Sequence, residues 1–169
     1  MQQIRNYRLH SSKFIQSHMD LESTLGPWLG RTMKMMDYYF QDSFKKANIN
    51  LTKQQWIVLK QLSVNDGIPQ NELAYITERD KTSIARLISL MEKKNLVARI
   101  PSKTDKRINL IHLTTNGKQT FEQTYPTVHT IIKTLQKDLT PEEVESTIKV
   151  LKKIQSNLTN HVMVVPTTK

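Results

Sequence analysis

Apolar residues recur at three- and four-residue intervals along residues 25–47, which is the spacing of a helix with one buried face. The row consists of Leu25, Leu29, Met33, Met36, Phe40 and Phe44. Pro27 suits the first turn of such a helix, where a backbone N–H has no intrahelical partner. The pattern therefore predicts an amphipathic helix from Leu25 to about Ala47.

Two shorter helices are expected next. Thr52 and Gln55 have the spacing of a capping box, so a helix should begin there and run to about Ser63. Its buried face would consist of Trp56, Leu59 and Leu62. A turn at residues 65–67 separates it from a helix over residues 70–77. The inward side chains of that helix would be Leu73, Ala74 and Ile76.

The helix expected from Asp80 to about Asn95 has two distinct faces. Asp80 is a favourable N-cap residue. The inward row is Ile84, Leu87, Ile88 and Met91. The opposite row, called the outer row below, is Thr82, Arg86, Ser89 and Lys93.

The hydrophobic period then changes from helix to strand. Residues 97–100 and 108–113 predict two strands, and the polar, basic segment 101–107 joins them as a hairpin. Helix returns from about Asn116 to Lys137, with a bend expected near Pro126. Thr140 and Pro141 begin a last helix. Its apolar row is Val144, Ile148, Leu151, Ile154 and Leu158.

This order predicts a mainly α fold with a small β-hairpin wing: a winged helix-turn-helix lobe plus a helical dimerisation region. We expect an N-terminal extension over residues 1–24, the winged lobe over 49–114, and the helical region over 25–48 and 115–165. The apolar rows of the flanking helices would be largely exposed on a single chain, so the protein is expected to work as a homodimer. Met19 precedes the stronger pattern, and whether it is the natural start stays open.

Charge narrows the function. The net charge is +10 and the pI about 9.8, which favours nucleic acid first and an acidic membrane surface second as partner. Residues 78–107 carry nine basic and four acidic side chains, so half of the net charge lies in this segment. The chain has no cysteine, which excludes disulfides and thiol chemistry. No apolar run is long enough to span a bilayer, and a cytoplasmic protein is expected.

The outer row has the chemistry of a helix that reads DNA. Its short hydroxyl side chains permit close approach to a groove, and Arg86 can bond a guanine edge with two hydrogen bonds. The hairpin tip adds Lys103, Lys106 and Arg107, of which an arginine suits a narrow minor groove. Asp105 is expected to orient Arg107 by an ion pair or to cap the turn.

The chain resembles the MarR family of regulators. Residues 80–97 (DKTSIARLISLMEKKNLV) are similar to its recognition helix and following strand, and residues 105–114 (DKRINLIHLT) to its wing. Residues 51–56 (LTKQQW) and 139–143 (LTPEE) also match typical segments. The resemblance implies a homodimeric repressor that binds a palindrome-like operator in double-stranded DNA and is released by a small aromatic or phenolic ligand. It implies no cofactor.

The resemblance also assigns roles to residues. Thr82, Ser83, Arg86 and Ser89 would face the major groove, and Arg107, supported by Asp105, would enter the minor groove. The phosphate contacts would be Gln70, Lys81, Lys103 and Lys106. The side chains expected to border a ligand pocket are Trp28, Met36, Tyr38, Tyr39, Trp56 and His129. Asn95 stands where the family usually has glycine, and asparagine tolerates the left-handed conformation expected there.

Three other functions were weighed against this one. The five histidines are scattered and no catalytic motif is present, so no enzymatic activity and no catalytic residue is expected. A metal-responsive regulator stays open as an alternative, although no metal-chelating spacing supports it. A non-specific architectural DNA-binding protein is the other alternative.

Overall fold

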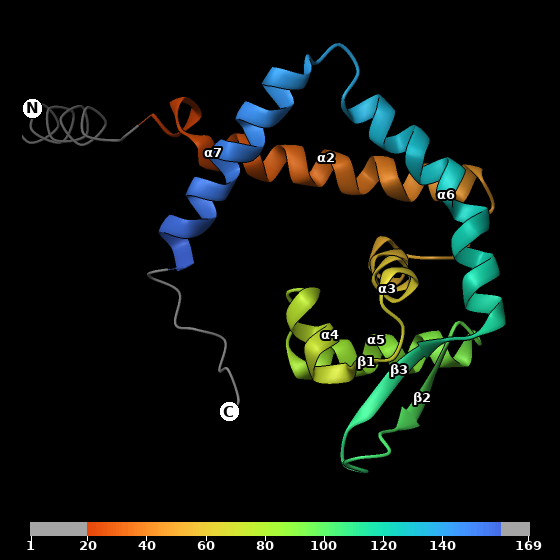
Figure 1. Ribbon diagram of the computed structural model, residues 1–169. Coiled ribbons are helices and arrows are strands. Elements are labelled where there is room, and N and C mark those ends of the chain that lie inside the picture. Colours follow the sequence, from red (N-terminus) through yellow and green to blue (C-terminus); the bar gives the residue numbers. More distant parts are fainter. Residues whose placement is uncertain (1–19, 160–169) are drawn as a thin grey trace, which may run out of the picture. The chain divides into compact units, whose positions relative to one another are not determined.

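The computed structural model describes residues 20–159 (Figure 1). The expectations for residues 1–19 and 160–169, which include most of the N-terminal extension and the start at Met19, lie outside the described residues. The chain forms two compact units, Met1–Ile57 and Val58–Lys169, and the division falls inside helix α3.

The first unit contains a short 3-10 helix, η1 (Leu21–Ser23), the long helix α2 (Leu25–Lys46) and the first turns of α3 (Lys53–Val64). Helix α2 lies where the sequence predicted it, and much of its apolar row is exposed on the single chain, as expected. Only Phe40 and Phe44 of its apolar row are buried, whereas Leu25 is 57% and Met33 51% exposed. On the first half of this apolar face, Leu29 is half-buried, whereas Leu25 and Met33 stay largely exposed within the described chain.

Helix α3 begins with the predicted capping box. The Thr52 hydroxyl oxygen accepts a hydrogen bond from the Gln55 amide at 3.2 Å, and the Gln55 side-chain oxygen accepts one from the Thr52 amide at 3.1 Å. Leu59 and Leu62 are buried as predicted, but Trp56 is only half-buried. The reciprocal pair satisfies two amides at the helix start, which have no intrahelical acceptor.

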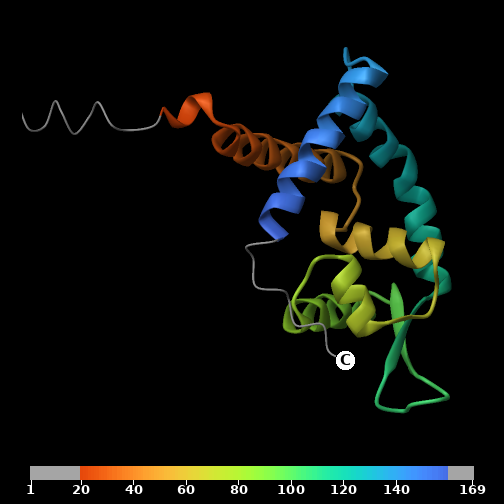
Figure 2. The ribbon, with the colours of Figure 1, turned by 60° about the vertical axis from the view of Figure 1, so that its left-hand side comes forward.

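The second unit contains the predicted winged arrangement. Helices α4 (Gln70–Ile76) and α5 (Lys81–Lys93) are followed by strands β2 (Val97–Pro101) and β3 (Asn109–Leu113), whose connection projects away from the helices (Figures 1 and 2). The register of this antiparallel hairpin pairs Val97 with Leu113 and Pro101 with Asn109. The mainly helical fold with a small β-wing is therefore confirmed.

The sheet has a third strand that the sequence did not reveal. Strand β1 (Ile68–Pro69) pairs with β3, so the order is β1-β3-β2. Two residues are too few to show an alternating pattern, and the formation of β1 depends on its partner. Gly67 permits this pairing because its φ of 77° lies in the left-handed region.

The core of the winged lobe consists of one face of α5 together with α4 and the sheet. Ile84, Ile88 and Met91 are buried on α5, and Leu73 and Ile111 are buried on α4 and β3. The expectation for Ile76 is wrong, because this side chain is 36% exposed. Ile76 is the last residue of α4, and the chain leaves the helix there through a left-handed Glu78.

Two long helices complete the second unit. Helix α6 (Thr115–Leu135) follows β3 directly, contains Pro126, and has a curved ribbon (Figure 1). The Thr114 hydroxyl caps it by accepting from the Gly117 amide at 2.9 Å. Helix α7 (Pro141–Thr159) starts with the predicted cap, since the Thr140 hydroxyl accepts from the Glu143 amide at 3.2 Å. Among the described residues, no helix is long and apolar enough to cross a membrane.

Candidate nucleic-acid interface

The start of α5 is held by its N-cap residue. One carboxylate oxygen of Asp80 accepts from the Ser83 amide at 2.8 Å, and the other accepts from the Ser83 hydroxyl at 2.6 Å. These bonds with Ser83 lower the pKa of Asp80 below its usual range. Ser83 is thus committed to the cap and is half-buried, whereas the adjacent Thr82 is exposed.

The outer row of α5 borders a shallow, open hollow of about 470 Å³. It is lined by Thr82, Ala85, Arg86, Ser89 and Leu90. Thr82 and Arg86 are exposed, and Leu90 is 53% exposed. Leu90 did not belong to either predicted row. The outer surface of α5 is therefore part polar and part apolar, a mixture that suits both the polar edges of bases and the methyl group of thymine.

Arg99 on β2 connects the outer row to the rest of the lobe. Its guanidinium donates to the Gln70 side-chain oxygen at 3.0 Å, to the Ala85 carbonyl at 3.0 Å and to the Ser89 hydroxyl at 3.1 Å. It also forms an ion pair with Glu92 at 2.5 Å. The side chains of Arg99 and Glu92 are 25% and 31% exposed, so this network is largely shielded from water.

Nothing in the sequence pattern marks Arg99. A lone arginine on an edge strand has no distinctive spacing, and its partners come from two other elements, α4 and α5. Two residues expected to contact DNA, Gln70 and Ser89, are half-buried and accept hydrogen bonds from Arg99. Arg99 thereby joins α4, α5 and β2, and it orients the face that these elements present.

At the wing, Asp105 and Arg107 form the pair expected from the sequence. The carboxylate accepts from the Arg107 backbone amide at 2.9 Å and from its guanidinium at 3.2 and 3.3 Å. The bonds from Arg107 lower the pKa of Asp105. The Arg107 side chain is nevertheless 90% exposed, and Lys103 and Lys106 are also exposed. Asp105 therefore both caps the turn and restrains an arginine that remains accessible.

A second polar contact lies where β3 meets the turn before β1. Asp66 accepts from the Leu113 amide at 2.7 Å, and its other oxygen lies 3.0 Å from His112 Nδ1. Burial alone raises the pKa of Asp66, but the Leu113 amide and His112 together outweigh it and leave the pKa lowered. The pair connects the end of α3 to the strand that continues into α6.

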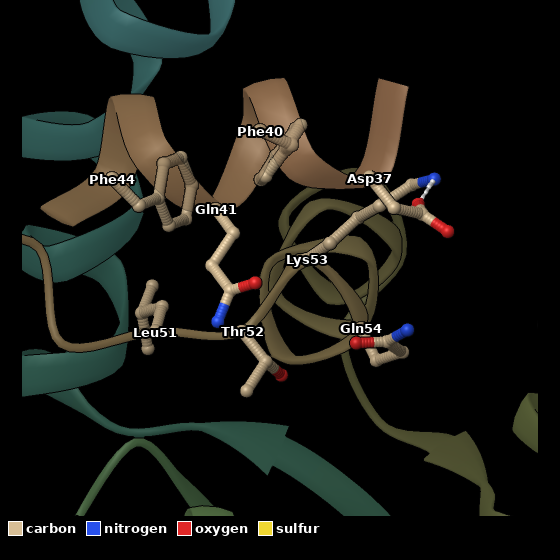
Figure 3. Close-up of a pocket in the computed structure, with 8 residues that line it drawn as sticks. All are labelled: Asp37, Phe40, Gln41, Phe44, Leu51, Thr52, Lys53 and Gln54. Carbon is tan, nitrogen blue, oxygen red and sulfur yellow. Dashed lines mark hydrogen bonds and ion pairs between the residues drawn. The ribbon is translucent and has the colours of Figure 1, made fainter. Parts of the chain in front are cut away.

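The first unit contains a cavity of about 300 Å³ beside the start of α3 (Figure 3). It is lined by Asp37, Phe40, Gln41, Phe44, Leu51, Thr52, Lys53 and Gln54. Phe40 and Phe44 contribute aromatic surface from α2, and Gln41 extends toward Thr52 (Figure 3). Lys53 forms an ion pair with Asp37 at 2.6 Å. The cavity therefore combines an aromatic wall with a charged rim.

None of the six residues expected to border a ligand pocket lines this cavity. The ring centroid of Trp56 lies 6.2 Å from that of Phe40, which lines the cavity. Trp28 and Tyr38 are exposed and lie beneath Arg31 and Lys34, respectively. His129 stacks on Tyr125 within α6. Aromatic residues that are conspicuous in the sequence do not mark this cavity, because its position depends on how α2 and α3 pack.

Known proteins resemble this arrangement. A model of the MarR family matches residues 49–108. The transcriptional activatory protein BadR of Rhodopseudomonas palustris is 30% identical over 112 residues, which cover 64% of each chain.

Two solved structures extend the likeness to most of the chain. A mutant MarR from Escherichia coli in complex with operator DNA is 27% identical, with a TM-score of 0.74 over 82% of this chain and 99% of that one. The fold also matches Bordetella bronchiseptica BpsR, whose DNA binding is regulated by 6-hydroxynicotinic acid. That match has 22% identity and a TM-score of 0.75 over 82% of this chain and 98% of that one.

The matched segment contains α4, α5 and the wing up to Ile108, which are the elements that carry the outer row, Arg99 and Arg107. The DNA-bound relative shares both the fold and more than a quarter of the aligned residues. Over residues 49–108 the chain therefore matches the MarR family of transcriptional regulators, and its fold contains the winged helix-turn-helix of the relative that was solved on operator DNA.

Proposed function

We propose that this protein is a cytoplasmic, homodimeric repressor that binds a palindrome-like operator and releases it when a small aromatic acid binds. The observation that carries the proposal is the joint presentation of the outer row and the wing by one lobe, in which Arg99 holds α4, α5 and β2 together. A repressor of this type acts by occupying DNA, so its affinity and its release are the two properties to measure.

In this proposal, helix α5 and the wing contact different parts of the DNA. Thr82, Arg86 and Ser89 enter the major groove, where Arg86 selects guanine. Ser83 lies at the same helix start, but its hydroxyl donates to the Asp80 carboxylate. Its proposed role is therefore to hold the start of α5 in place beside the groove. Arg107 enters the minor groove, and its restraint by Asp105 reduces the entropy lost on binding. Lys103 and Lys106 neutralise phosphates beside it.

The homodimer is supported by apolar surface that each unit leaves uncovered. On α7 the predicted row remains accessible, with Ile148 46%, Leu151 37% and Leu158 56% exposed. On α2, Leu25 and Met33 of the apolar row are likewise exposed. Monomeric proteins rarely leave long apolar rows in water, so a second copy of the chain is the proposed cover. Two lobes related by a twofold axis would require two related half-sites.

The operator can be sought without knowing the regulated genes. Repeated selection from random duplexes should enrich one sequence with two related half-sites, and the purified protein should bind it about 10³-fold or more tightly than random DNA. Failure to enrich any sequence, together with equal affinity for all duplexes, would favour the architectural DNA-binding alternative. Placing the selected site across a promoter before a reporter gene then distinguishes repression from activation.

Two variants test the division between helix and wing. Arg107→Ala should weaken binding by about 1–3 kcal/mol on the selected site while the dimer stays folded. Arg86→Ala should reduce the preference for particular base pairs more than the affinity for random DNA. An equal loss on both DNAs would reassign Arg86 to a phosphate contact.

The effector is proposed to bind the cavity between α2 and α3. Phe40 and Phe44 would contact an aromatic ring, and Lys53 would pair with its carboxylate after exchanging its bond with Asp37. Calorimetry with salicylate and 6-hydroxynicotinate as probes should give binding that Lys53→Ala weakens and Lys60→Ala, an exposed lysine on the same helix, leaves unchanged. A probe that binds equally well to both variants would place the effector elsewhere.

The metal-responsive alternative has no support from geometry in the described part of the chain. Within residues 20–159, no three His, Asp or Glu side chains are grouped so that they could hold a metal ion. His10, His18 and His161 lie outside those residues.

A further inference from the structure

A polar cavity lies between the helices and the wing of the second unit. It has a volume of about 290 Å³ and is lined by Gln70, Asn71, Lys81, Arg107, Ile108 and Asn109. These residues come from three places: the start of α4, the start of α5 and the junction of the wing with β3. We call this cavity the notch. Neither Asn71 nor Asn109 was among the residues expected to contact DNA.

The lining of the notch has the chemistry of an anion site. It contains an ammonium group, a guanidinium group and three carboxamides, and no carboxylate. Asn71, Lys81 and Asn109 are exposed, so their polar groups are accessible to a ligand. The Gln70 oxygen already accepts from Arg99, which leaves the amide nitrogen as the donor that this side chain offers. Donors therefore predominate around the notch.

The charges of the side chains that line the notch indicate which anion it can bind. Arg107 on its wing side is bonded to Asp105, so Lys81 is the cation in the notch without an ion pair of its own in the described structure. One ammonium group and several neutral N–H donors match a singly charged group with several acceptor oxygens. A phosphodiester of the DNA backbone has this charge and this number of acceptors.

We propose that the notch binds one backbone phosphodiester of DNA, held by Lys81 and by the side-chain amides of Asn71 and Asn109. This inference rests on the proposed DNA-binding role of α5 and the wing. Because Lys81 begins α5 and Asn109 begins β3, one phosphate would join the helix that enters the major groove to the root of the wing. The notch would thus set the register of both elements on the same DNA.

The first test measures how DNA affinity depends on salt. With a random-sequence duplex, Lys81→Ala should make the negative slope of log K against log salt concentration shallower by about 0.9, the value for one phosphate contact. Asn71→Ala and Asn109→Ala should weaken binding roughly 3- to 10-fold at constant salt without changing the slope. Lys133→Ala and Gln119→Ala, exposed positions on α6, serve as matched controls and should change neither quantity.

The second test asks whether these residues act on the same phosphate. In the Lys81→Ala background, Asn109→Ala should cost clearly less affinity than it does alone, since the shared ligand is already lost. Additive losses, or an unchanged salt slope for Lys81→Ala, would overturn the proposal. Circular dichroism and thermal melting of every variant exclude unfolding as the cause.

The third test identifies the phosphate. Neutral methylphosphonates placed one at a time along a duplex selected by the wild-type protein should weaken wild-type binding at one position per half-site. The Lys81→Ala variant should lose no further affinity when that position is substituted. Equal losses of affinity at every position would contradict the binding of one phosphate in the notch. If no duplex is selected, the proposal of a sequence-specific regulator is wrong. The salt dependence measured on random DNA still tests whether the notch binds a phosphate.

A free phosphate ion is the other source of this chemistry. Inorganic phosphate exchanged for chloride at constant ionic strength should displace DNA only weakly, because the isolated ion lacks the neighbouring contacts. Displacement by low-millimolar phosphate that disappears in Lys81→Ala would make the notch a free-phosphate site and would overturn its assignment to DNA.

Discussion

At the scale of single residues, the side chains of the proposed DNA-binding face are held in place by others that do not belong to it. Arg99 is the main example, because it bonds Gln70, Ala85, Ser89 and Glu92 from one position on β2. Its planar guanidinium holds several acceptors at fixed angles, which a lysine ammonium cannot reproduce. Arg99 is thus a positioning residue for the outer row.

Arg99→Ala should lower the free energy of unfolding by roughly 1–3 kcal/mol, because Glu92 and several acceptors lose their donor in a partly shielded site. Arg99→Lys should recover only part of this loss. Chemical denaturation measures both. Arg86→Ala, an exposed arginine on α5, is the control and should leave the unfolding free energy within about 0.5 kcal/mol of wild type.

The contacts of Asp66 with the Leu113 amide and with His112 predict a dependence of stability on pH. The pKa of Asp66 is lower in the folded protein than in the unfolded chain, so the folded state favours the charged carboxylate. Its contribution is complete above the unfolded pKa, near 4, and is lost as the pH falls through the lower folded value. Thermal melts from pH 5 to pH 2.5 should therefore fall more steeply for wild type than for Asp66→Asn. Parallel curves would show that these contacts contribute nothing to this pH dependence.

At the scale of elements, the start of α6 is constrained by close packing. A Cβ added at Gly117 would lie 2.0 Å from the Leu96 carbonyl oxygen, a backbone atom that cannot turn away. The neighbouring Thr114 both caps α6 and donates to the Asn95 carbonyl at 2.6 Å. The strand that leaves α5 and the helix that follows the wing are therefore in direct backbone contact.

Gly117→Ala should consequently destabilise the lobe by about 1–3 kcal/mol or more, since the helix must shift to admit one methyl group. Gly30→Ala on α2 is the matched control, because no atom lies within 4 Å of the added Cβ and alanine favours a helix. Thermal unfolding should show opposite signs for the two substitutions. Equal effects would mean that Gly117 matters only for helix propensity.

At the scale of the whole molecule, the exposed apolar rows make association the expected state. In the proposed dimer, Leu151 lies in an interface and its replacement by a charge would place an unpaired carboxylate in apolar surroundings. Leu151→Glu should therefore produce monomer, or unfolded chain, at micromolar concentrations in sedimentation experiments. Lys152→Glu, the exposed neighbour on α7, should remain dimeric. A monomeric wild-type protein would contradict the dimer itself.

Sequence alone determined the features that depend on local interactions. The capping residues Thr52, Asp80 and Thr140 and the left-handed Asn95 are present as predicted, because each acts within a few residues of its own position. Helical phase likewise separated Ile84, Ile88 and Met91 from Thr82 and Arg86. The pairing of Asp105 with Arg107 is equally local.

Only the tertiary structure decided the features that depend on distant partners. Strand β1 forms because β3 lies beside it, and Arg99 acquires its role from acceptors up to 29 positions away. The notch joins residues from the starts of two helices with the root of the wing, and the cavity beside α3 is lined by none of the expected aromatic residues. Periodicity reports which face of an element is apolar. It does not report what covers that face, because that depends on the packing of elements far apart in sequence.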